Sequence, residues 1–169
     1  GHAFIDAVVA KGIRGIIVSA DTGKTVPHDR WRAQGITCLA VDDTTAALGR
    51  LAAYQRGRAK IPVVAITGSN GKTTTKELTA AVVGRKFNTL FTKGNLNNEI
   101  GLPLTLLKTD SDHQVGVLEM GMYVRGDIRS LADIAQPHIG VVTNVAEVHA
   151  ERAGTLADIA EAKRELVEA

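Results

Sequence analysis

Short apolar runs alternate with longer segments of helical spacing along the chain. The runs at 13–19, 36–41, 62–67, 88–92, 114–120 and 138–145 have the length and composition of buried strands. Apolar residues recur every three or four positions at 4–9, 42–57, 72–86, 97–107, 126–136 and 155–169, which predicts helices. A short helix is also predicted within 24–35, ended by Gly35, and a break is expected at 101–103, where "GLP" interrupts a helix.

The order of these elements predicts an α/β fold. Four strand–helix pairs follow one another from residue 62 onward, and such a succession is typical of a parallel sheet with helices on its faces. The basic, proline-containing "RAKIP" at 58–62 precedes them and predicts a domain boundary near residue 60. The helix at 42–57 has Asp42 or Asp43 as its expected N-cap.

Composition narrows the class of protein. The formal net charge of +2 and an aromatic content of 4% do not favour a nucleic-acid partner, which needs a basic surface and stacking side chains. No apolar run reaches the roughly 18 residues of a membrane span. The sequence therefore predicts a soluble cytoplasmic protein that does not insert into a membrane, and it leaves the oligomeric state open.

Polar residues follow four of the predicted strands directly. They are Gly68 to Thr73 after the first, Lys93 to Asn98 after the second, Glu119 at the end of the third, and Asn144 and His149 beyond the fourth. Ligands of open parallel sheets bind beyond the carboxyl ends of the strands. We therefore expect these four clusters to meet at one edge of the sheet.

The first cluster has the residues of a phosphate-binding loop. In "TGSNGKT", Gly68 and Gly71 permit unusual backbone conformations, so that backbone N–H groups can point at phosphate oxygens beside a helix N-terminus. Lys72 would reach the β- and γ-phosphates, and the Thr73 hydroxyl would bind Mg²⁺. The spacing is GxxGKT, which is shorter than the common version of the motif; the alternative is an ordinary turn between strand and helix.

The other polar residues each allow two interpretations. Glu119 could hold a divalent cation or be a solvated strand end, and His149 could be a ligand or a surface histidine. Asn97 and Asn98 could contact substrate or shape a turn. Lys163 replaces an apolar residue in the stripe Leu156, Ile159, Leu166, so its amine either reaches the rim or is desolvated and used. A neutral amine can react with carbon dioxide to give an anionic carbamate.

The motifs "TGSNGKTTTKE", "TKGNLNNEIGLPLTLL", "LEMGM", "IAQPHIGVVTNV" and "AEAKRELV" resemble, in this order, those of the Mur ligases of peptidoglycan synthesis. The stretches "GNLNNEIGLP" and "LEMGM" are most similar to the branch that adds D-alanyl-D-alanine. The resemblance implies that residues 1–60 are the C-terminal part of a uridine-nucleotide-binding domain. It implies that 61–169 are the N-terminal part of a P-loop-type ATP-binding central domain, so the sequence is expected to be an excerpt that forms no amide bond alone.

The resemblance also implies roles for individual residues. ATP phosphates would be bound by the loop residues Gly68, Ser69, Asn70, Gly71, Lys72, Thr73 and Thr74. Two Mg²⁺ ions are implied, with Thr73 on one and with Glu119 and His149 on a second. Lys72, Lys163 and His149 would be catalytic, with Lys163 carbamoylated in several members, and Asn97 and Asn98 would lie near the γ-phosphate and the acceptor carboxylate.

The implied reaction is ATP-dependent amide-bond formation between UDP-N-acetylmuramoyl-tripeptide and D-alanyl-D-alanine through an acyl phosphate. The segment Tyr123-Val124-Arg125 departs from the family pattern, which puts substrate contacts there in question. Alternatives are the ligase that adds the third amino acid, a folylpolyglutamate synthase, and a non-catalytic nucleotide-binding module. A P-loop GTPase is disfavoured because the sequence contains no N-K-x-D motif.

Overall fold

The computed structural model describes residues 2–147 and 154–169, which form two compact units, 1–47 and 48–169. The division falls within helix α4 (Thr44–Arg58). The Asp43 carboxylate accepts the N–H groups of Thr45 and Ala46 at 2.7 and 3.0 Å, which confirms an aspartate cap for this helix. The assignment of 1–60 and 61–169 to two functional domains stays a prediction, and each compact unit is described by itself.

The first unit is a small two-stranded α/β layer. A 3₁₀ turn η1 (His2–Phe4) and helices α1 (Ile5–Ala10), α2 (Ala20–Gly23) and α3 (His28–Ala33) accompany the parallel strands β1 (Gly15–Ser19) and β2 (Thr37–Val41). Its core is formed by Ile16, Val18, Trp31 and Ile36. Helix α2 and the turn η1 were not predicted from the sequence; α2 begins where the Ser19 hydroxyl accepts the Thr22 N–H.

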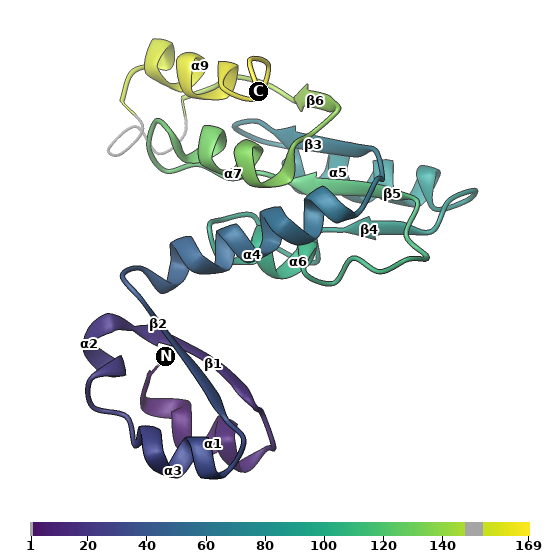
Figure 1. Cartoon of the computed structure of the whole chain (residues 1–169). Coiled ribbons are helices and arrows are strands. Elements are labelled where there is room, and N and C mark those ends of the chain that lie inside the picture. The colour runs from purple at the N-terminus through teal and green to yellow at the C-terminus, as the bar shows by residue number, and fades with distance from the viewer. Residues whose placement is uncertain (1, 148–153) are drawn as a thin grey trace. The chain divides into compact units, whose positions relative to one another are not determined.

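The second unit contains a four-stranded sheet whose neighbouring strands are all parallel, in the order β4-β5-β3-β6 (Figure 1). The strands are β3 (Val63–Thr67), β4 (Thr89–Phe91), β5 (Val115–Glu119) and β6 (Ile139–Val142). Helices α5 (Lys72–Val83), α6 (Gly101–Leu106), α7 (Asp127–Ala135) and α9 (Leu156–Arg164) alternate with them. The predicted α/β class and parallel sheet are confirmed.

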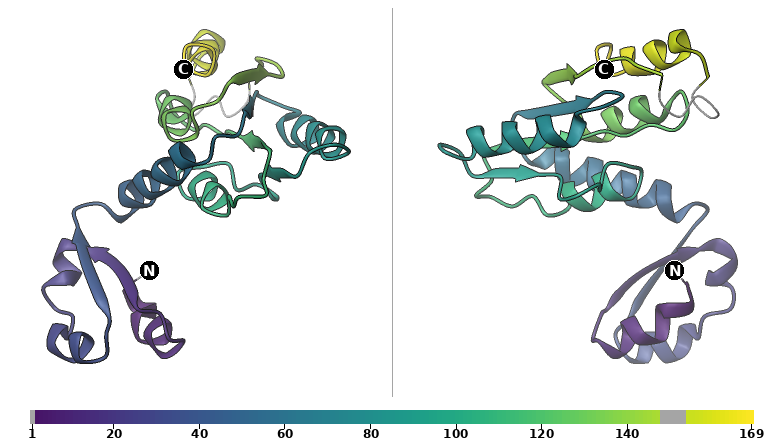
Figure 2. Two further views of the ribbon diagram at one scale, coloured as in Figure 1. Left: turned by 45° about the vertical axis from the view of Figure 1, so that its right-hand side comes forward. Right: turned by 180° about the vertical axis from the view of Figure 1, so that it is seen from behind.

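Helices cover both faces of this sheet (Figure 2). On one face, Val63, Ala65 and Leu118 pack with residues of α4, α6 and α7, and on the other Ile66 and Val117 pack with Ala80 of α5. Alternate residues of β3 therefore face opposite layers, which is why this strand is apolar throughout. A sheet that is buried on both faces leaves its carboxyl edge as the place for polar side chains.

The predicted break at 101–103 is wrong in its position. Helix α6 begins at Gly101, and residues 97–100 form a turn before it. Pro103 lies in the first turn, where its missing N–H removes no helical hydrogen bond. The Asn98 side chain accepts the N–H groups of Ile100 and Gly101 at 3.3 and 2.9 Å and so starts the helix.

A buried arginine joins α4 to the end of α7. Arg56 is 5% exposed and donates to the carbonyls of Ala135, Gln136 and Ala59 at 2.7, 3.0 and 2.7 Å. Gln136 has a left-handed backbone (φ 44°), so the helix stops there with carbonyls directed at the guanidinium. The cation satisfies carbonyl groups that the helix end leaves without donors.

We expect Arg56→Met to lower the free energy of unfolding by about 3 kcal/mol, because several buried carbonyls lose charged donors. Arg58→Met is the matched control, since Arg58 lies two residues further along α4 with an exposed side chain. Urea denaturation of both variants checks the prediction. Equal stability of the two variants would show that the carbonyl contacts of Arg56 contribute nothing.

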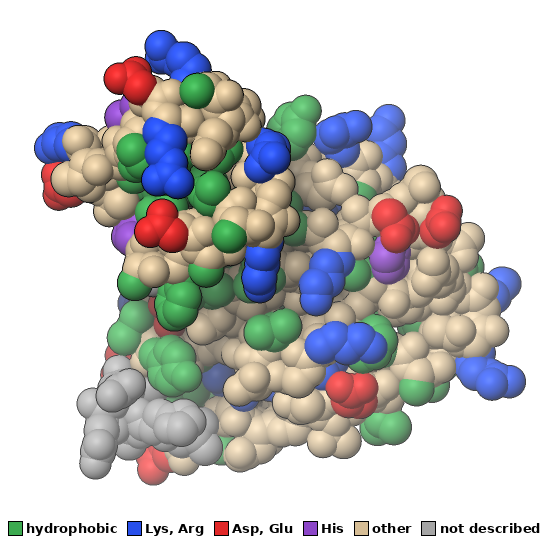
Figure 3. Space-filling view, turned by 90° about the horizontal axis from the view of Figure 1, so that it is seen from below, with side chains coloured by type: hydrophobic (Ala, Val, Ile, Leu, Met, Phe, Trp, Pro, Cys, Tyr) green, Lys and Arg blue, Asp and Glu red, His purple; other side chains and the backbone are tan. Residues whose placement is uncertain are grey.

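The surface mixes apolar and charged side chains. Figure 3 shows basic side chains scattered among acidic and apolar ones on one face. Exposed apolar residues include Leu78 and Val82 of α5, and single residues of this kind are ordinary on protein surfaces. Among the described residues, every helix is too short or too polar to cross a membrane.

Candidate functional site

The glycine-rich loop between β3 and α5 is shaped by two glycines with positive φ. Gly68 has φ 149°, and a Cβ there would lie 1.8 Å from the Thr143 hydroxyl oxygen. Gly71 has φ 77° and is the N-cap residue of α5. The close approach of Thr143 and the left-handed backbone at Gly71 explain why the loop requires glycine at both positions.

The loop is bonded to the segment that follows β6. The Ser69 N–H donates to the Asn144 carbonyl at 3.1 Å, and the Ser69 hydroxyl donates to the Ala146 carbonyl at 2.8 Å. The Asn70 N–H donates to the Asn144 side-chain oxygen at 2.9 Å, and the Thr143 hydroxyl donates to the Asn70 carbonyl at 2.6 Å. Ser69 and Asn70 thus hold the loop in shape, and their predicted contact with a nucleotide stays a prediction.

Lys72 occupies the first position of α5 and folds back over the loop. Its amine donates to the carbonyls of Gly68 at 2.8 Å and Ser69 at 3.4 Å, and its side chain lines a pocket. Neutral carbonyls are weaker partners for an ammonium than phosphate oxygens are. An anion above the loop would therefore draw the amine away from them. Thr73 and Thr74 follow in the first turn of α5 and are exposed.

Glu119 ends β5 with a buried carboxylate. It is 1% exposed, so the interpretation as a solvated strand end is wrong. Its Oε1 accepts the side-chain N–H of Asn97 at 2.7 Å, and its Oε2 has no hydrogen-bond partner among the residues that the structure describes. The Asn97 carbonyl in turn accepts the Gly121 N–H at 2.8 Å. A buried carboxylate oxygen without a donor is the expected arrangement for a ligand of a cation.

Lys163 lies on α9 with its amine desolvated. It is 3% exposed, and its Nζ contacts the Met122 sulfur at 3.5 Å, so the amine does not reach the rim. Burial, and to a smaller extent the charge of Lys72, lowers the pKa of Lys163 below its usual value. Of the predicted stripe, Ile159 and Leu166 are buried, whereas Leu156 is 44% exposed because it begins the helix.

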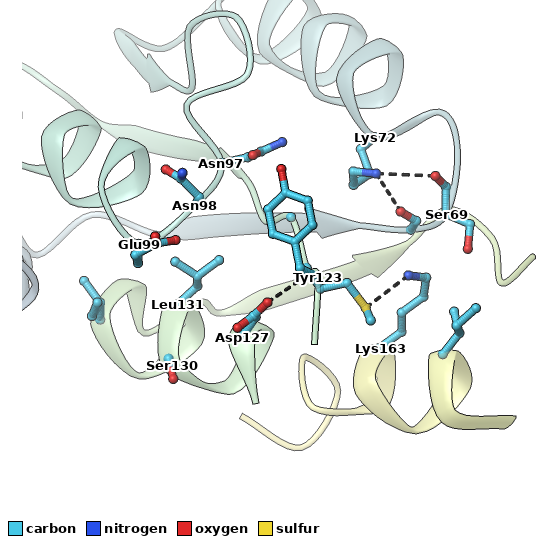
Figure 4. A pocket seen from close by; sticks show the side chains of 15 residues that line it. Ser69, Lys72, Asn97, Asn98, Glu99, Tyr123, Asp127, Ser130, Leu131 and Lys163 are labelled. Carbon is cyan, nitrogen blue, oxygen red and sulfur yellow. Dashed lines mark hydrogen bonds between the residues drawn. The ribbon is translucent and has the colours of Figure 1, made fainter. Parts of the chain in front are cut away.

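Six of the predicted site residues line one pocket of about 310 Å³. Its lining includes Gly68, Ser69, Lys72, Asn97, Asn98 and Lys163, which come from three separate segments of the second unit (Figure 4). Glu119 is tied to this lining through Asn97, whereas Asn70, Gly71, Thr73 and Thr74 do not line the pocket. Of the four clusters predicted to converge, the first two therefore line one pocket, Glu119 is bonded to the second through Asn97, and Asn144 is bonded to the first through Asn70.

Part of the predicted site cannot be placed. His149 lies outside the described residues, so its assignment as ligand and catalytic residue stays a prediction. Within 2–147 and 154–169 there is no group of three or more His, Cys, Asp or Glu side chains that could hold a metal ion. A cation near Glu119 would need oxygen ligands of other kinds, such as the Thr73 hydroxyl or the phosphates of a nucleotide.

The sequence did not predict two further lining residues, Tyr123 and Asp127. The Asp127 carboxylate accepts the N–H groups of Tyr123 and Val124 at 2.7 and 3.0 Å and fixes this turn at the N-terminus of α7. Tyr123 is largely exposed and lines the pocket (Figure 4). The sequence did contain a sign of this role for Asp127, because it stands at the start of a predicted helix, where acidic residues are favoured. The turn at Tyr123 and Val124 is therefore held by local hydrogen bonds.

Lys163→Met is expected to raise the melting temperature by a few degrees at neutral pH. The folded-state pKa of Lys163 is lowered relative to the unfolded chain, so the unfolded state binds the proton more tightly. In the wild-type protein, keeping Lys163 protonated in the folded state costs free energy. This cost is full at pH values below the pKa of Lys163 in the folded state, and it disappears as the pH rises toward the pKa of the unfolded chain. The stabilising effect of the variant should therefore shrink in alkaline buffer.

Thermal unfolding of wild type and variant between neutral pH and pH ~10, near the ordinary pKa of a lysine side chain, measures this difference. Lys86→Met, at an exposed lysine after α5, is the matched control and should show no such pH dependence. A constant difference between wild type and Lys163→Met across this range would contradict the lowered pKa.

Comparisons with known proteins agree with the motifs and the sheet. The family described as Mur ligase middle domain matches residues 66–169. The chain belongs to the Mur ligase family. Among curated Mur ligases, the UDP-N-acetylmuramoyl-tripeptide–D-alanyl-D-alanine ligase of Synechocystis is 42% identical over 99% of this chain, and that of Escherichia coli is 39% identical over 98%.

Solved structures of Mur ligases have the same fold. MurF from Acinetobacter baumannii superimposes with a TM-score of 0.85 at 39% identity, covering 99% of this chain and 35% of that one. The MurF ligase of Thermotoga maritima in complex with ADP gives a TM-score of 0.85 at 37% identity, covering 98% of this chain and 36% of that one. The chain spans about a third of the length of the curated relatives it matches, 35% and 34% for the two named above.

Proposed function

We propose that this chain is part of an ATP-dependent ligase that joins D-alanyl-D-alanine to UDP-N-acetylmuramoyl-tripeptide in peptidoglycan synthesis. One observation carries the proposal: Lys72 of the glycine-rich loop, Asn97, Asn98 and Lys163 line a single pocket. The similarity to ligases that are named for this reaction, over 98–99% of this chain, supports the choice of substrates.

The loop 68–74 is the proposed site for the ATP phosphates. Its backbone lies at the N-terminus of α5, where N–H groups and the helix dipole favour anions. The MurF ligase of Thermotoga maritima, which is 37% identical to this chain and covers 98% of it, was solved with ADP. We propose that Lys72 leaves the carbonyls of Gly68 and Ser69 when phosphate arrives and neutralises the charge that develops there.

The residues present fit a divalent cation. The unpartnered Glu119 Oε2 is a buried anionic oxygen, and the exposed Thr73 hydroxyl stands in the first turn of α5. We propose Glu119 and Thr73 as ligands of two Mg²⁺ ions, with His149 as a further candidate outside the described residues. When bound, Mg²⁺ would neutralise the charge of the triphosphate.

The proposed reaction has two steps. The terminal carboxylate of the tripeptide attacks the γ-phosphorus of ATP, the bond to the β-phosphate oxygen breaks, and ADP leaves. The amine of D-alanyl-D-alanine then attacks the acyl phosphate, loses a proton and expels inorganic phosphate. The first step joins two anions, so the positive charge of Lys72 contributes by electrostatic stabilisation. Asn97 and Asn98 would orient the acceptor carboxylate.

Lys163 has a proposed role as an anion in this site. Its lowered pKa increases the fraction of neutral amine, which can add carbon dioxide and release a proton to form a carbamate. The resulting carboxylate would face Lys72, whose charge already lowers the pKa of Lys163.

We further propose that 1–60 belongs to the uridine-nucleotide domain and 61–169 to the ATP domain, and that the reaction takes place in the cytoplasm, where both nucleotides are available.

The test is a substrate-dependent ADP-release assay on the full-length protein with Mg²⁺ and ATP. ADP release that requires both UDP-N-acetylmuramoyl-tripeptide and D-alanyl-D-alanine, with the joined product seen by mass spectrometry, supports the proposal. Release that requires glutamate and folate, or the dipeptide substrate and a third amino acid, would reassign the substrates. Nucleotide binding without any ligation would instead indicate a non-catalytic module.

A further inference from the structure

One buried lysine connects the phosphate-binding loop with the asparagine segment. Lys76 lies one turn after Lys72 on α5 and is 0% exposed, which makes it the largest side chain fully buried among the described residues. Its amine donates to the Glu77 carboxylate at 2.6 Å and to the Thr92 carbonyl at 2.8 Å, with the Gly94 carbonyl at 3.5 Å. The three N–H groups of an ammonium thus have three oxygen partners.

The acceptors of Lys76 belong to the segment that leaves β4 and leads to Asn97 and Asn98. Thr92 is itself fully buried and is held from the other side as well, because its hydroxyl accepts the Glu119 N–H at 3.0 Å. The Glu119 carboxylate then binds the Asn97 side chain at 2.7 Å. A chain of bonds therefore runs from α5 through Lys76 and Thr92 to Glu119 and Asn97.

The first step of this chain of bonds joins two elements that are not paired in the sheet, helix α5 and the segment after β4. β4 pairs with β5 alone, and α5 packs across the sheet face beside it. Phe91 is the last residue of β4 in the pairing with β5. Backbone bonds from the Thr92 N–H to the Val117 carbonyl at 3.1 Å and from the Gly121 N–H to the Asn97 carbonyl at 2.8 Å hold the segment 92–98 on the side of β5, whereas Lys76 bonds it to α5. Lys76 supplies the bonds from α5 to two of its carbonyls.

We propose that Lys76 is a positioning residue, which fixes the distance between the phosphate-binding loop and the Asn97–Glu119 pair. This inference rests on the proposed function for its catalytic consequence. None of the hydrogen-bond partners of the Lys76 amine, Glu77, Thr92 and Gly94, lines the pocket, so the amine acts through Thr92 and the backbone of 92–94. Loss of its amine would let the asparagine segment move away from α5 without removing any group that binds phosphate.

The first test is hydrogen exchange on wild type and Lys76→Met. Methionine fills a similar volume without donors, so the carbonyls of Thr92 and Gly94 lose their partner. We expect amide exchange across 92–98 to speed up by about tenfold or more, as for a segment that opens locally, with α7 unchanged. Lys93→Met is the matched control, because Lys93 lies in the same segment but is exposed and contacts the Phe91 ring.

The second test separates positioning from stability in the full-length protein. Lys76→Met should lower kcat by about 10–100-fold, the effect of misplaced reacting groups, while KM for ATP changes by less than about threefold. Glu77→Gln removes the ion pair but keeps the Thr92 contact, and it should behave like wild type. A lower melting temperature with unchanged kcat and unchanged exchange across 92–98 would overturn the proposal.

A further variant covers the case in which Lys76→Met does not fold. Thr92→Val keeps Lys76 and removes only the hydroxyl that accepts the Glu119 N–H, so it breaks the same chain of bonds at its next step. It should speed exchange of the Glu119 amide and lower kcat; wild-type behaviour in both would count against the proposal. If the wild-type enzyme shows no ligation, the proposed function fails, and the exchange results alone decide whether Lys76 holds the segment.

Discussion

Lys72→Ala is expected to abolish nucleotide binding by the full-length protein while the fold stays intact. The amine is the charged side chain of the glycine-rich loop and lines the pocket. Each charged hydrogen bond to a phosphate oxygen contributes about 1.5–3 kcal/mol. Loss of these bonds should raise the Kd for ATP at least about 100-fold. Ligation should fall by about 10³-fold, because the developing charge loses a preorganised cation.

The fold should tolerate this change because, among the described residues, the hydrogen bonds of the Lys72 amine go only to the carbonyls of Gly68 and Ser69, which lie in its own loop. Unfolding free energy should change by less than about 1 kcal/mol. Isothermal titration with ATP and Mg²⁺ measures the Kd, and Lys86→Ala, which deletes an exposed lysine after α5, is the matched control. Unchanged ATP affinity in Lys72→Ala would mean that the loop is an ordinary turn.

Local pattern predicted most of the second unit. The strands at 62–67 and 114–120 were identifiable because β3 and β5 are buried on both faces and therefore apolar throughout. The loop 68–72 was identifiable because its glycines are required by a positive φ and by the close approach of Thr143. Lys163 was identifiable because it interrupts an apolar stripe on a helix that packs against the sheet.

The remaining features depend on the order of the strands, which periodicity does not contain. The bond between Asn97 and Glu119 exists because β4 lies beside β5, and the bond between Asn70 and Asn144 exists because β6 lies beside β3. Nothing in the local pattern "TTTKE" distinguished Lys76 from its polar neighbours, yet it is fully buried and its amine donates to the segment after β4. Convergence at the carboxyl edge was predictable, but the individual partners were not.

Glu119→Gln is expected to separate activity from stability. Glutamine keeps an oxygen for the Asn97 side chain and replaces the unpartnered Oε2 with an amide nitrogen. Burial of an uncompensated carboxylate is costly, so its neutral isostere should leave the metal-free melting temperature unchanged or raise it by a few degrees. Ligation by the full-length protein should fall by about 100-fold or more, because the proposed ligand of the cation that would neutralise the triphosphate is lost.

Thermal unfolding with ATP, with and without Mg²⁺, measures the two effects in one experiment. In wild type, Mg²⁺ should add to the stabilisation by ATP, since a ligand that binds only the folded state raises the melting temperature. In Glu119→Gln the rise in melting temperature caused by Mg²⁺ should be lost, while the melting temperature without Mg²⁺ should be unchanged or higher. Asp133→Asn, which neutralises an exposed acid on α7, is the matched control and should keep the Mg²⁺ effect. If Glu119→Gln lowers the melting temperature without Mg²⁺ and the variant is still stabilised by Mg²⁺, the carboxylate has a structural role. Replacing a ligand of the cation should instead leave the metal-free fold stable and remove the stabilisation by Mg²⁺.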